Sequence, residues 1–307
     1  MANNVSAFIP EVWSKKLLRE SKEISDFKNN MTNRDWEGEI KNFGDTVRIT
    51  TPNAAAIVIG EGVVPDTSNV YPEQIVMTID KTKNFQFKFN DVEQAQSQFN
   101  MVEGYMSLAN QKMLDEVNLE LEQAVVDAAE AGTVSKIGTA ASPTATTFDN
   151  VNNVFNKIKR ILVANKALSA SGFYTFKGNQ EQALQLAPVV TMGPTMYEGL
   201  MNSNKLTHPT VAGDDILYKG VAGQIAGMKI FQDTNIEKVT ATSLADTANV
   251  IIAGTKMGIT FAEQYSKVEK LRDPQTFADI GRGLYLYGYK IVNPKSLVVA
   301  YVAAPTA

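Results

Sequence analysis

The longest regular pattern of apolar residues lies between positions 91 and 131. Apolar side chains recur there at alternating steps of three and four residues, which predicts one continuous face of a long helix. Asp91 can cap the first turn of this helix, and Gly132 can end it. At a rise of about 1.5 Å per residue the helix would be about 60 Å long. The opposite face is acidic in the second half of the helix, at Asp115, Glu116, Glu120 and Glu122.

Residues 45–90 alternate between apolar and polar positions, as β-strands with one face in water do. Two strands are expected over 74–81 and 84–91, and phenylalanines occupy every second position of the later one. Residues 81–83 separate these two strands, which are predicted to pair antiparallel. Turn-forming residues at about 60–72 predict the tip of a projecting hairpin, although an ordinary surface sheet would have the same pattern.

The first 45 residues are polar and have few apolar positions. A short amphipathic helix is expected over 14–27, and the asparagines and threonine at 29–33 are expected to end it. Four aromatic residues are scattered along the segment: Phe8, Trp13, Trp36 and Phe43. Because so little apolar surface cannot be buried against itself, the segment docks either on another chain or on its own domain.

A second helical pattern covers residues 148–168. Its inward face is apolar, at Val151, Val154, Phe155, Ile158, Ile161 and Leu162. Its other face is basic, at Lys157, Lys159, Arg160 and Lys166. The small, polar stretch 133–148 before it is predicted to be a linker. The basic face is interpreted as solvated, with contact to phosphate groups as the less common alternative.

The next hundred residues are less regular. A strand is expected over 173–178 and a short helix over 179–189, followed by a loop-rich segment over 191–215 with one helical turn. Strands interrupted by glycines come next, at Gly220, Gly223 and Gly227. The spacing of these glycines is not that of a dinucleotide-binding loop, so they are assigned to turns or bulges.

The end of the chain is dominated by strands. Residues 248–264 contain a buried apolar strand followed by a turn, and 256–304 is sheet-like throughout. Tyr285, Tyr287 and Tyr289 alternate with other residues, so the three tyrosines are expected on one face. Helices and strands are mixed without regular βαβ alternation, which predicts an α+β fold.

Composition narrows the possible functions. The chain has 307 residues, of which 44% are hydrophobic, and this is enough for a folded protein with a sizeable core. Its net charge is −4, without the basic stripe of a protein that reads DNA sequence. No stretch approaches the ~20 apolar residues of a membrane helix, and no signal peptide is visible. We therefore expect a cytosolic protein, unless a larger particle carries it out.

Candidate catalytic chemistry is sparse. The absence of cysteine excludes disulfides, thiolate nucleophiles and cysteine-ligated metals, and the single histidine, His208, excludes a two-histidine metal site within one chain. His208 lies in a polar loop and is expected to be a surface or capping residue. The adjacent Asp214 and Asp215 could bind a divalent cation or act in acid–base chemistry, although such pairs are usually just solvated. We expect no catalytic residue, cofactor or metal.

The order of these parts resembles the major capsid proteins of tailed bacteriophages, which have the HK97-like fold. The likeness is carried by FIPEVWSKKLLRE at 8–20, GDTVRI at 44–49, LYKGVAGQIAGMKIFQDTNI at 217–236 and the closing run GRGLYLYGYKIVNPKSLVV at 281–299. The resemblance implies five parts: an N-terminal arm (1–45), an E-loop β-hairpin (46–90), a spine helix of the P-domain (91–132), an A-domain (146–255) and returning P-domain strands (256–307).

The resemblance also implies a function in assembly. Such a subunit forms hexamers and pentamers of an icosahedral virion shell, which assembles in the host cytoplasm. The implied partners are other copies of the chain, portal, scaffold and decoration proteins, and packaged double-stranded DNA bound without sequence specificity; no membrane is implied. Candidates for contact between subunits are Phe8, Trp13, Trp36, Glu61, Asp66, Glu73, Lys81 and Lys83. Candidates for facing nucleic acid are Lys157, Lys159, Arg160 and Lys166.

Other functions stay open at this point. An encapsulin-type nanocompartment has the same shell fold but needs an inner pocket for its cargo, which the sequence does not show. A carboxylate-dependent hydrolase, a function of a different class, would depend on Asp214 and Asp215. A surface adhesin is disfavoured because no signal peptide is visible.

Overall fold

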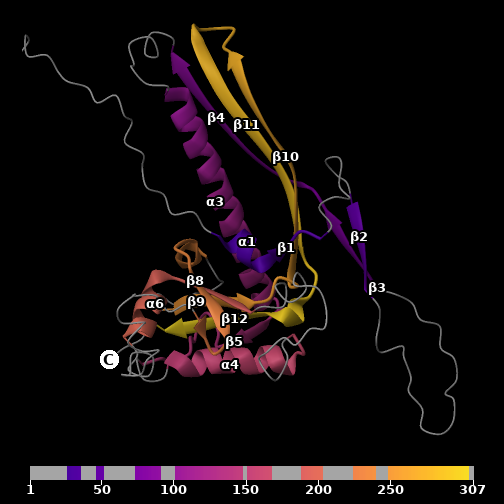
Figure 1. Ribbon diagram of the computed structural model, residues 1–307, viewed down its shortest axis with the longest axis vertical. Coiled ribbons are helices and arrows are strands. Elements are labelled where there is room, and N and C mark those ends of the chain that lie inside the picture. The colour runs from indigo at the N-terminus through magenta and orange to yellow at the C-terminus, as the bar shows by residue number, and fades with distance from the viewer. Residues whose placement is uncertain are drawn as a thin grey trace, which may run out of the picture.

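One long helix joins two β-sheets in the computed structural model of the protein (Figure 1). The structure describes residues 26–35, 46–51, 73–90, 101–147, 151–167, 188–202, 224–239 and 248–303. The helix, α3 (Met101–Glu130), contributes buried side chains to a core that also contains residues of both larger sheets. A third, two-stranded sheet lies beside the longer of the two.

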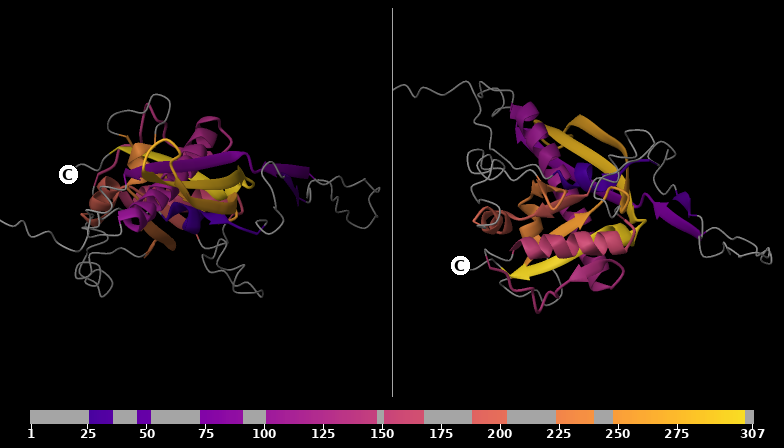
Figure 2. Two further views of the ribbon diagram at one scale, coloured as in Figure 1. Left: turned by 90° about the horizontal axis from the view of Figure 1, so that it is seen from above. Right: turned by 60° about the horizontal axis from the view of Figure 1, so that its bottom comes forward.

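The six-stranded sheet is apolar on both faces. Its strands, in spatial order, are β5 (Ser135–Ile137), β12 (Leu297–Ala303), β9 (Ala248–Gly254), β6 (Val189–Met192), β8 (Met228–Gln232) and β7 (Gln224–Ile225). In β9, Val250 and Ile252 pack with α3, whereas Ile251 and Ala253 pack with the helix α4 (Val151–Ala164) on the other face. Figure 2 shows α4 lying across this sheet. A helix on each face explains why these strands are continuously apolar rather than alternating.

The four-stranded sheet is longer and has one wetter face. Its order is β1 (Thr32–Asn33), β10 (Ile259–Arg272), β11 (Ala278–Ile291) and β4 (Lys81–Asn90). Figure 1 shows β10 and β11 running from the core along α3 to the far end of the molecule. Their register shifts between Gln264 and Lys267, which is a β-bulge that increases local bend and twist. The tyrosines at 285, 287 and 289 share one face as predicted, and the first two are buried.

The predicted end of the long helix is confirmed. Gly132 has φ of +79°, its N–H bonds to the carbonyl of Ala129, and the N–H of Thr133 bonds to that of Ala128. These two bonds form a Schellman motif, which needs the left-handed conformation that glycine adopts most easily. The predicted start at Asp91 lies outside the described residues.

The prediction of an acidic face on this helix is wrong at two positions. Glu122 is fully buried, and Glu120 bonds to side chains of the four-stranded sheet. Both sheets contact the second half of α3, so this half has neighbours on more than one side. Val125 and Val126, side by side in the sequence, are therefore both buried. A single apolar stripe describes a helix at a surface, not one shared by two sheets.

The hairpin prediction is right for its first strands and wrong for the third. Strand β2 (Thr46–Thr51) pairs antiparallel with β3 (Glu73–Thr78), while the predicted tip at 60–72 lies outside the described residues. Strand β4 pairs with β11 rather than β3, and residues 81–83 belong to it instead of separating two strands. The alternation indicated a strand with one wet face, but it could not specify the partner strand.

The asparagines at 29 and 30 do not end a helix. They lie inside α1 (Phe27–Met31), whose Phe27 and Met31 are buried in the core formed with α3. The described part of the N-terminal segment therefore docks on its own domain. Asparagine is only weakly unfavourable in a helix, so burial of two large apolar side chains outweighs it.

Three further predictions need correction. The expected linker at 133–148 contains β5, which pairs parallel with β12, and Thr144, which forms a bridge with Val302. The closing strand β12 lies inside the six-stranded sheet rather than beside β10 and β11. The expected helical turn within 191–215 is the eight-residue helix α6 (Pro194–Met201). Short 3₁₀ helices η4 (Asn235–Lys238) and η5 (Pro294–Ser296) complete the described elements, and the strand and helix expected at 173–189 lie largely outside them.

Candidate functional site

Most of the predicted contact and catalytic residues lie outside the described part of the chain. These are Phe8, Trp13, Trp36, Glu61 and Asp66 among the contact candidates, and His208, Asp214 and Asp215 among the catalytic ones. Glu73 is the first residue of β3. Lys81, Lys83 and the four cations of the second helix are the candidates whose surroundings the structure shows.

Lys81 and Lys83 converge on one carboxylate of the long helix. Both point from β4 to Glu120: Lys81 forms an ion pair with it, and the Lys83 Nζ lies 3.6 Å from its Oε2. From β11, the hydroxyl of Tyr287 donates to Glu120, and that of Tyr289 does so at 3.4 Å. The Lys81 Nζ also lies 4.7 Å from the ring centre of Tyr289, a cation–π contact. This network holds β4 and β11 against α3.

The electrostatics of this network favour the charged carboxylate. Burial by itself would raise the pKa of Glu120, but hydrogen bonds from Lys81 and Tyr287 and the charges of Lys81 and Lys83 lower it below its usual value. Partial burial would lower the pKa of Lys81, but its interactions with Glu120 and Tyr289 raise it above its usual value. Burial and the bond to Glu120 raise the pKa of Tyr287 well above its usual value. Contact of Lys81 and Lys83 with a neighbouring subunit stays a prediction.

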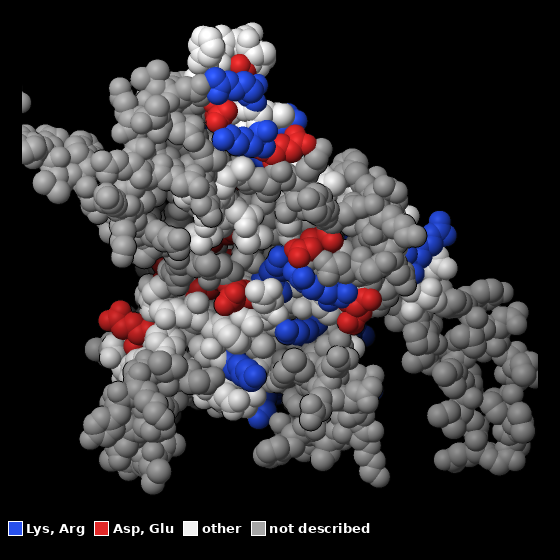
Figure 3. Space-filling model, turned by 45° about the horizontal axis from the view of Figure 1, so that its top comes forward, with Lys and Arg blue, Asp and Glu red and all other residues white. Residues whose placement is uncertain are grey.

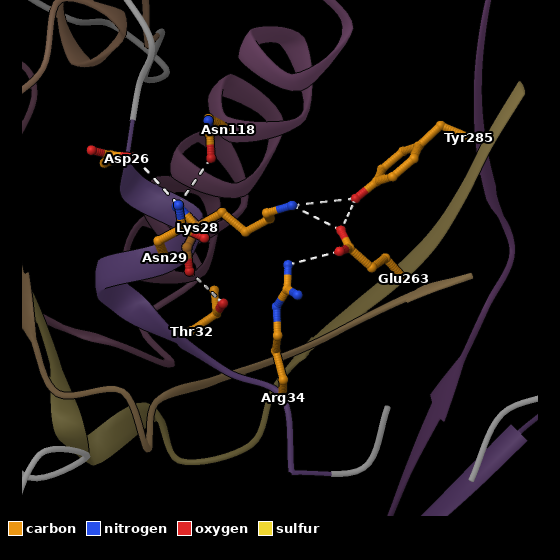
Figure 4. Close-up of polar contacts among 8 residues, drawn as sticks. All are labelled: Asp26, Lys28, Asn29, Thr32, Arg34, Asn118, Glu263 and Tyr285. Carbon is orange, nitrogen blue, oxygen red and sulfur yellow. Dashed lines mark hydrogen bonds and ion pairs between the residues drawn. The ribbon is translucent and has the colours of Figure 1, made fainter. Parts of the chain in front are cut away.

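A second network joins the N-terminal helix to the long sheet (Figure 4). Glu263 of β10 accepts bonds from the Lys28 Nζ at 2.8 Å and from Arg34 at 2.9 Å, and the hydroxyl of Tyr285 also donates to it. The backbone N–H of Lys28 donates to Asn118 of α3 at 3.0 Å. One lysine thus contacts both the helix and the sheet, and this explains why α1 lies where they meet.

Glu263 is also held in its charged form. Burial opposes ionisation, but the bonds from Lys28 and Tyr285 and the charges of Lys28 and Arg34 together lower the pKa of its carboxyl. Nothing in the spacing of these residues indicated the network, because its members come from the N-terminal segment, α3, β10 and β11, which are far apart in the sequence. The alternation of the tyrosines was the one usable signal, since it placed Tyr285 and Tyr287 on the same face.

The far end of β10 and β11 is covered by paired charges of opposite sign. Arg282 bonds to Glu269 at 2.6 Å, Lys270 to Asp279 at 2.8 Å, and Lys88 of β4 to Asp273. Figure 3 shows this alternation of blue and red over the end of the molecule. Phe277, in the turn that joins the two strands, is 83% exposed. An aromatic ring so exposed at a projecting tip suits contact with another molecule.

The predicted basic face of the second helix is confirmed as a surface. Lys157, Arg160 and Lys166 are exposed and Lys159 is half-buried, while the predicted inward residues of α4 are buried except for Ile161, which is partly buried. No described residue forms an ion pair with these four cations. The sequence signal was sufficient here because α4 covers a sheet with one side only, so a single apolar stripe decides its orientation.

The described ranges contain neither a cluster of metal-binding side chains nor a helix that could span a membrane. There, no three acidic or histidine side chains come together in a way that could hold a metal ion. Among the described helices, none is long and apolar enough to cross a membrane.

Comparison with known proteins bears on the fold. No protein-family model and no curated protein matches the sequence. Solved structures do match. A structure from Mycobacterium phage Che8 has a TM-score of 0.75 and 21% identity, covering 98% of both chains. The capsid structure of the cyanophage P-SCSP1u has a TM-score of 0.64 and 12% identity, covering 99% of this chain and 95% of that one.

The chain has the HK97-like capsid fold. The predicted α+β class and this shell fold are therefore confirmed, and the likeness covers nearly the whole chain. The virus-like particle from Pyrococcus furiosus is a weaker match to this HK97-like chain, with a TM-score of 0.50 and 15% identity over 89% of it and 90% of the other.

Proposed function

We propose that the protein is the major capsid protein of a tailed phage, which assembles as hexamers and pentamers into the icosahedral head around double-stranded DNA. The observation that carries the proposal is the match to phage capsid structures over 98% and 99% of this chain, because it includes the projecting parts as well as the core. Identity of 21% or less shows the fold, so the function remains our inference from it.

The shape of the chain supports this function. The long sheet and α3 extend well away from the six-stranded sheet (Figure 1), so much of the surface lies on projecting elements. Large apolar side chains are exposed on α3, at Tyr105, and at the tip of β10 and β11, at Phe277; Val76 is exposed on β3 of the two-stranded sheet. Exposed apolar groups cost free energy in water, and contact with neighbouring subunits would bury them.

The five predicted parts acquire definite roles under this proposal. The arm (1–45) and the E-loop (46–90) reach over neighbouring subunits, the spine helix (91–132) resists distortion, and the A-domain (146–255) meets its copies at the centre of each capsomer. Two boundaries need adjustment, because β4 pairs within the long sheet and β12 lies in the six-stranded sheet. Portal, scaffold and decoration proteins are the further partners we propose, with assembly in the host cytoplasm.

Electron microscopy of the purified chain, with light scattering on a sizing column, tests the proposal. Shells, sheets or rings of five and six subunits are expected. A monomer or dimer that persists across salt and protein concentration would contradict it. Phe277→Ala provides a variant for the same measurement: it should fold normally and assemble only at higher protein concentration, whereas Gln275→Ala at the same tip should assemble like the parent chain.

A nanocompartment that encloses protein is the second candidate, and the match to the Pyrococcus furiosus particle is the observation in its favour. The contents of purified particles distinguish the two. Packaged DNA after infection supports the phage head, while an enclosed protein encoded beside this gene supports the nanocompartment. The hydrolase hypothesis rests on Asp214 and Asp215, outside the described residues, and loss of a hydrolytic activity on replacing both with alanine would support it.

A further inference from the structure

The helix α4 has an unusual distribution of charge for this protein. Between positions 151 and 167 the sequence has four basic residues and no acidic one, although the whole chain has 33 acidic and 29 basic residues. Helices with solvated faces usually mix both signs, since opposite charges one turn apart stabilise the helix. Cations with no acidic partner among the described residues instead destabilise it slightly, which suggests that an anion meets this face.

A pocket opens on this face of the helix. Its volume is about 370 Å³, and one wall consists of Asn153, Asn156, Lys157 and Arg160 of α4. The side chains of these four residues project from one side of the helix, because they are three, four and seven positions apart. The other wall is the segment 144–146.

The wall formed by 144–146 is firmly held. The N–H of Thr144 donates to the carbonyl of Tyr301 at 2.9 Å, and its carbonyl accepts from the N–H of Ala303 at 3.0 Å. The hydroxyl of Thr146 donates to the carbonyl of Ala303 at 2.8 Å. The segment thus pairs with the end of β12. The buried apolar face of α4 packs on the same sheet and fixes the helix there. The two walls therefore keep their separation without a ligand.

The side chains of the pocket are suited to a phosphate group. Lys157 and Arg160 supply charged donors, and Asn153, Asn156 and Thr144 supply neutral ones; none of the described residues that line the pocket is acidic. Arginine, lysine, asparagine and threonine are the residues that contact phosphates of a DNA backbone, and such contacts carry no sequence information. We propose that this pocket binds a backbone phosphate of duplex DNA, an inference that rests on the proposed function.

The proposal narrows the four basic candidates to two. Lys157 and Arg160 line the pocket, whereas Lys159 of the same helix and Lys166, two residues beyond its end, are not among the described residues that line it. Two cations in a chain of net charge −4 bind DNA weakly on their own. Many copies in one shell would act together, so weak sites hold the packaged DNA without trapping it on free subunits.

The decisive experiment measures binding of a fluorescent 20-base-pair duplex to the full chain before assembly, across a salt series. Lys157→Gln with Arg160→Gln should weaken binding at low salt by roughly tenfold and reduce the slope of log affinity against log salt by about 2. Lys159→Gln with Lys166→Gln is the matched control, because it removes the same charge from α4 and the turn that follows it, outside the pocket. Equal losses of affinity in the two double variants, or no loss in the Lys157 and Arg160 variant, would contradict the proposed phosphate pocket.

Competitors identify the source of the anion. Inorganic phosphate at millimolar concentration should displace the duplex from the parent chain, and polyglutamate of equal charge should displace it less. If polyglutamate competes equally well, the pocket is not specific for phosphate and the proposal fails. If inorganic phosphate binds but the duplex does not, the pocket binds a free phosphate and the proposed contact with DNA is wrong.

Particles provide a second measurement if the chain purifies only as shells. The nucleic acid retained per mass of protein after a salt wash should fall for the pocket pair and not for the control pair. Microscopy of the same preparations separates the two proposals. Intact shells with unchanged DNA retention in the pocket variant overturn this inference alone, while the absence of shells from the parent chain contradicts the proposed function.

Discussion

The two larger sheets of this protein are stabilised in different ways. The central strands of the six-stranded sheet are almost entirely buried: six of the seven residues of β12 are, and neighbouring positions face α3 and α4 in turn. In β11 of the four-stranded sheet, buried and exposed positions alternate over much of the strand. Around this sheet, Glu120 of α3 and Glu263 of β10 each bind lysine side chains and tyrosine hydroxyls. The first region depends on apolar burial, the second on polar networks at its junctions.

This difference has consequences for how each region responds to conditions. Apolar burial is insensitive to pH and packs to a single dense arrangement. Half-buried ion pairs are weaker, vary with pH and salt, and can exchange partners. We therefore expect the six-stranded sheet to behave as the rigid part of the subunit and the long sheet with its helix as the adaptable part.

The largest effect is expected in the dry core. Phe155 of α4 is fully buried against the six-stranded sheet, so Phe155→Ala should lower the free energy of unfolding by about 3–5 kcal/mol. Denaturant unfolding followed by circular dichroism measures this loss. Phe277→Ala removes the same ring from an exposed site and should change stability little. A loss below about 1 kcal/mol for Phe155→Ala would break the comparison, because the six-stranded sheet would then not depend on burial.

The next effect concerns the junction between the hairpin and the long sheet. A Cβ at Gly288 of β11 would meet the carbonyl oxygen of Thr78 and lie 3.0 Å from the Cα of Ile79. Because these are backbone atoms that cannot turn aside, Gly288→Ala should cost about 3 kcal/mol, the upper end for overpacking. Gly132→Ala has free space around its Cβ and strain from φ alone, so its thermal midpoint should fall less. A larger fall in thermal midpoint for Gly132→Ala than for Gly288→Ala would show that the backbone at this junction moves to accommodate an added methyl group.

A buried acid in α3 should give the core a dependence on pH. Burial, and then the nearby Asp233 and Asp115, raise the pKa of Glu122 to about 10, so it is protonated in the folded chain at neutral pH. The unfolded chain ionises it above about 4.5. Its contribution to stability is therefore complete below pH 4.5 and is lost progressively as pH rises toward 10.

Glu122→Gln tests this dependence, since the amide resembles the protonated acid. The unfolding free energy of the variant should rise relative to that of the parent chain by on the order of 2 kcal/mol between about pH 5 and pH 6.5. Glu116→Gln, exposed on the same helix, is the control and should show no such gain. If the parent and Glu122→Gln have parallel pH profiles, Glu122 is ionised in the fold, and the core is less dry than its burial indicates.

A smaller effect is expected at the polar network where α1 meets the long sheet. Glu263→Gln keeps the shape but removes the negative charge that Lys28 and Arg34 contact, which should cost about 1 kcal/mol at pH 7. The pKa of Glu263 is lowered in the fold, so its contribution is present above about pH 4.5 and disappears as pH falls through the lowered value. The difference between parent and variant should therefore shrink in acid.

Arg282→Ala tests an exposed ion pair of the same sheet, for comparison with the half-buried pairs of Glu263. Its ion pair with Glu269 lies at the exposed end of the sheet and should contribute between about 0 and 1 kcal/mol, removed by high salt. Unfolding at low and high salt separates the two pairs. A larger loss for Arg282→Ala than for Glu263→Gln would show that the end of the sheet, rather than its junction with α1, is the stabilising part.

The sequence predicted well those elements that have one simple environment. The apolar stripe of α4 and its basic outer face, the turn at Gly132, the β2–β3 hairpin and the shared face of the tyrosines were all readable, because each depends on residues close together in the chain. The errors concern partners. The strand β4 pairs with β11 and not with the predicted neighbour, and the predicted linker contains the strand β5. Glu120 and Glu122 face the protein and not the predicted solvent side of their helix.

By itself, then, the sequence determined the class of fold, the long helix and its end, the alternation of the strands and the charge of the outer face of α4. Only the tertiary structure decided which strands pair, that α3 is shared by two sheets, and that Lys28, Arg34 and Tyr285 meet at Glu263. The physical reason is the range of the interactions. Periodicity, caps and turns are local properties of the backbone, whereas pairing and burial of charge depend on groups that only the folded chain brings together.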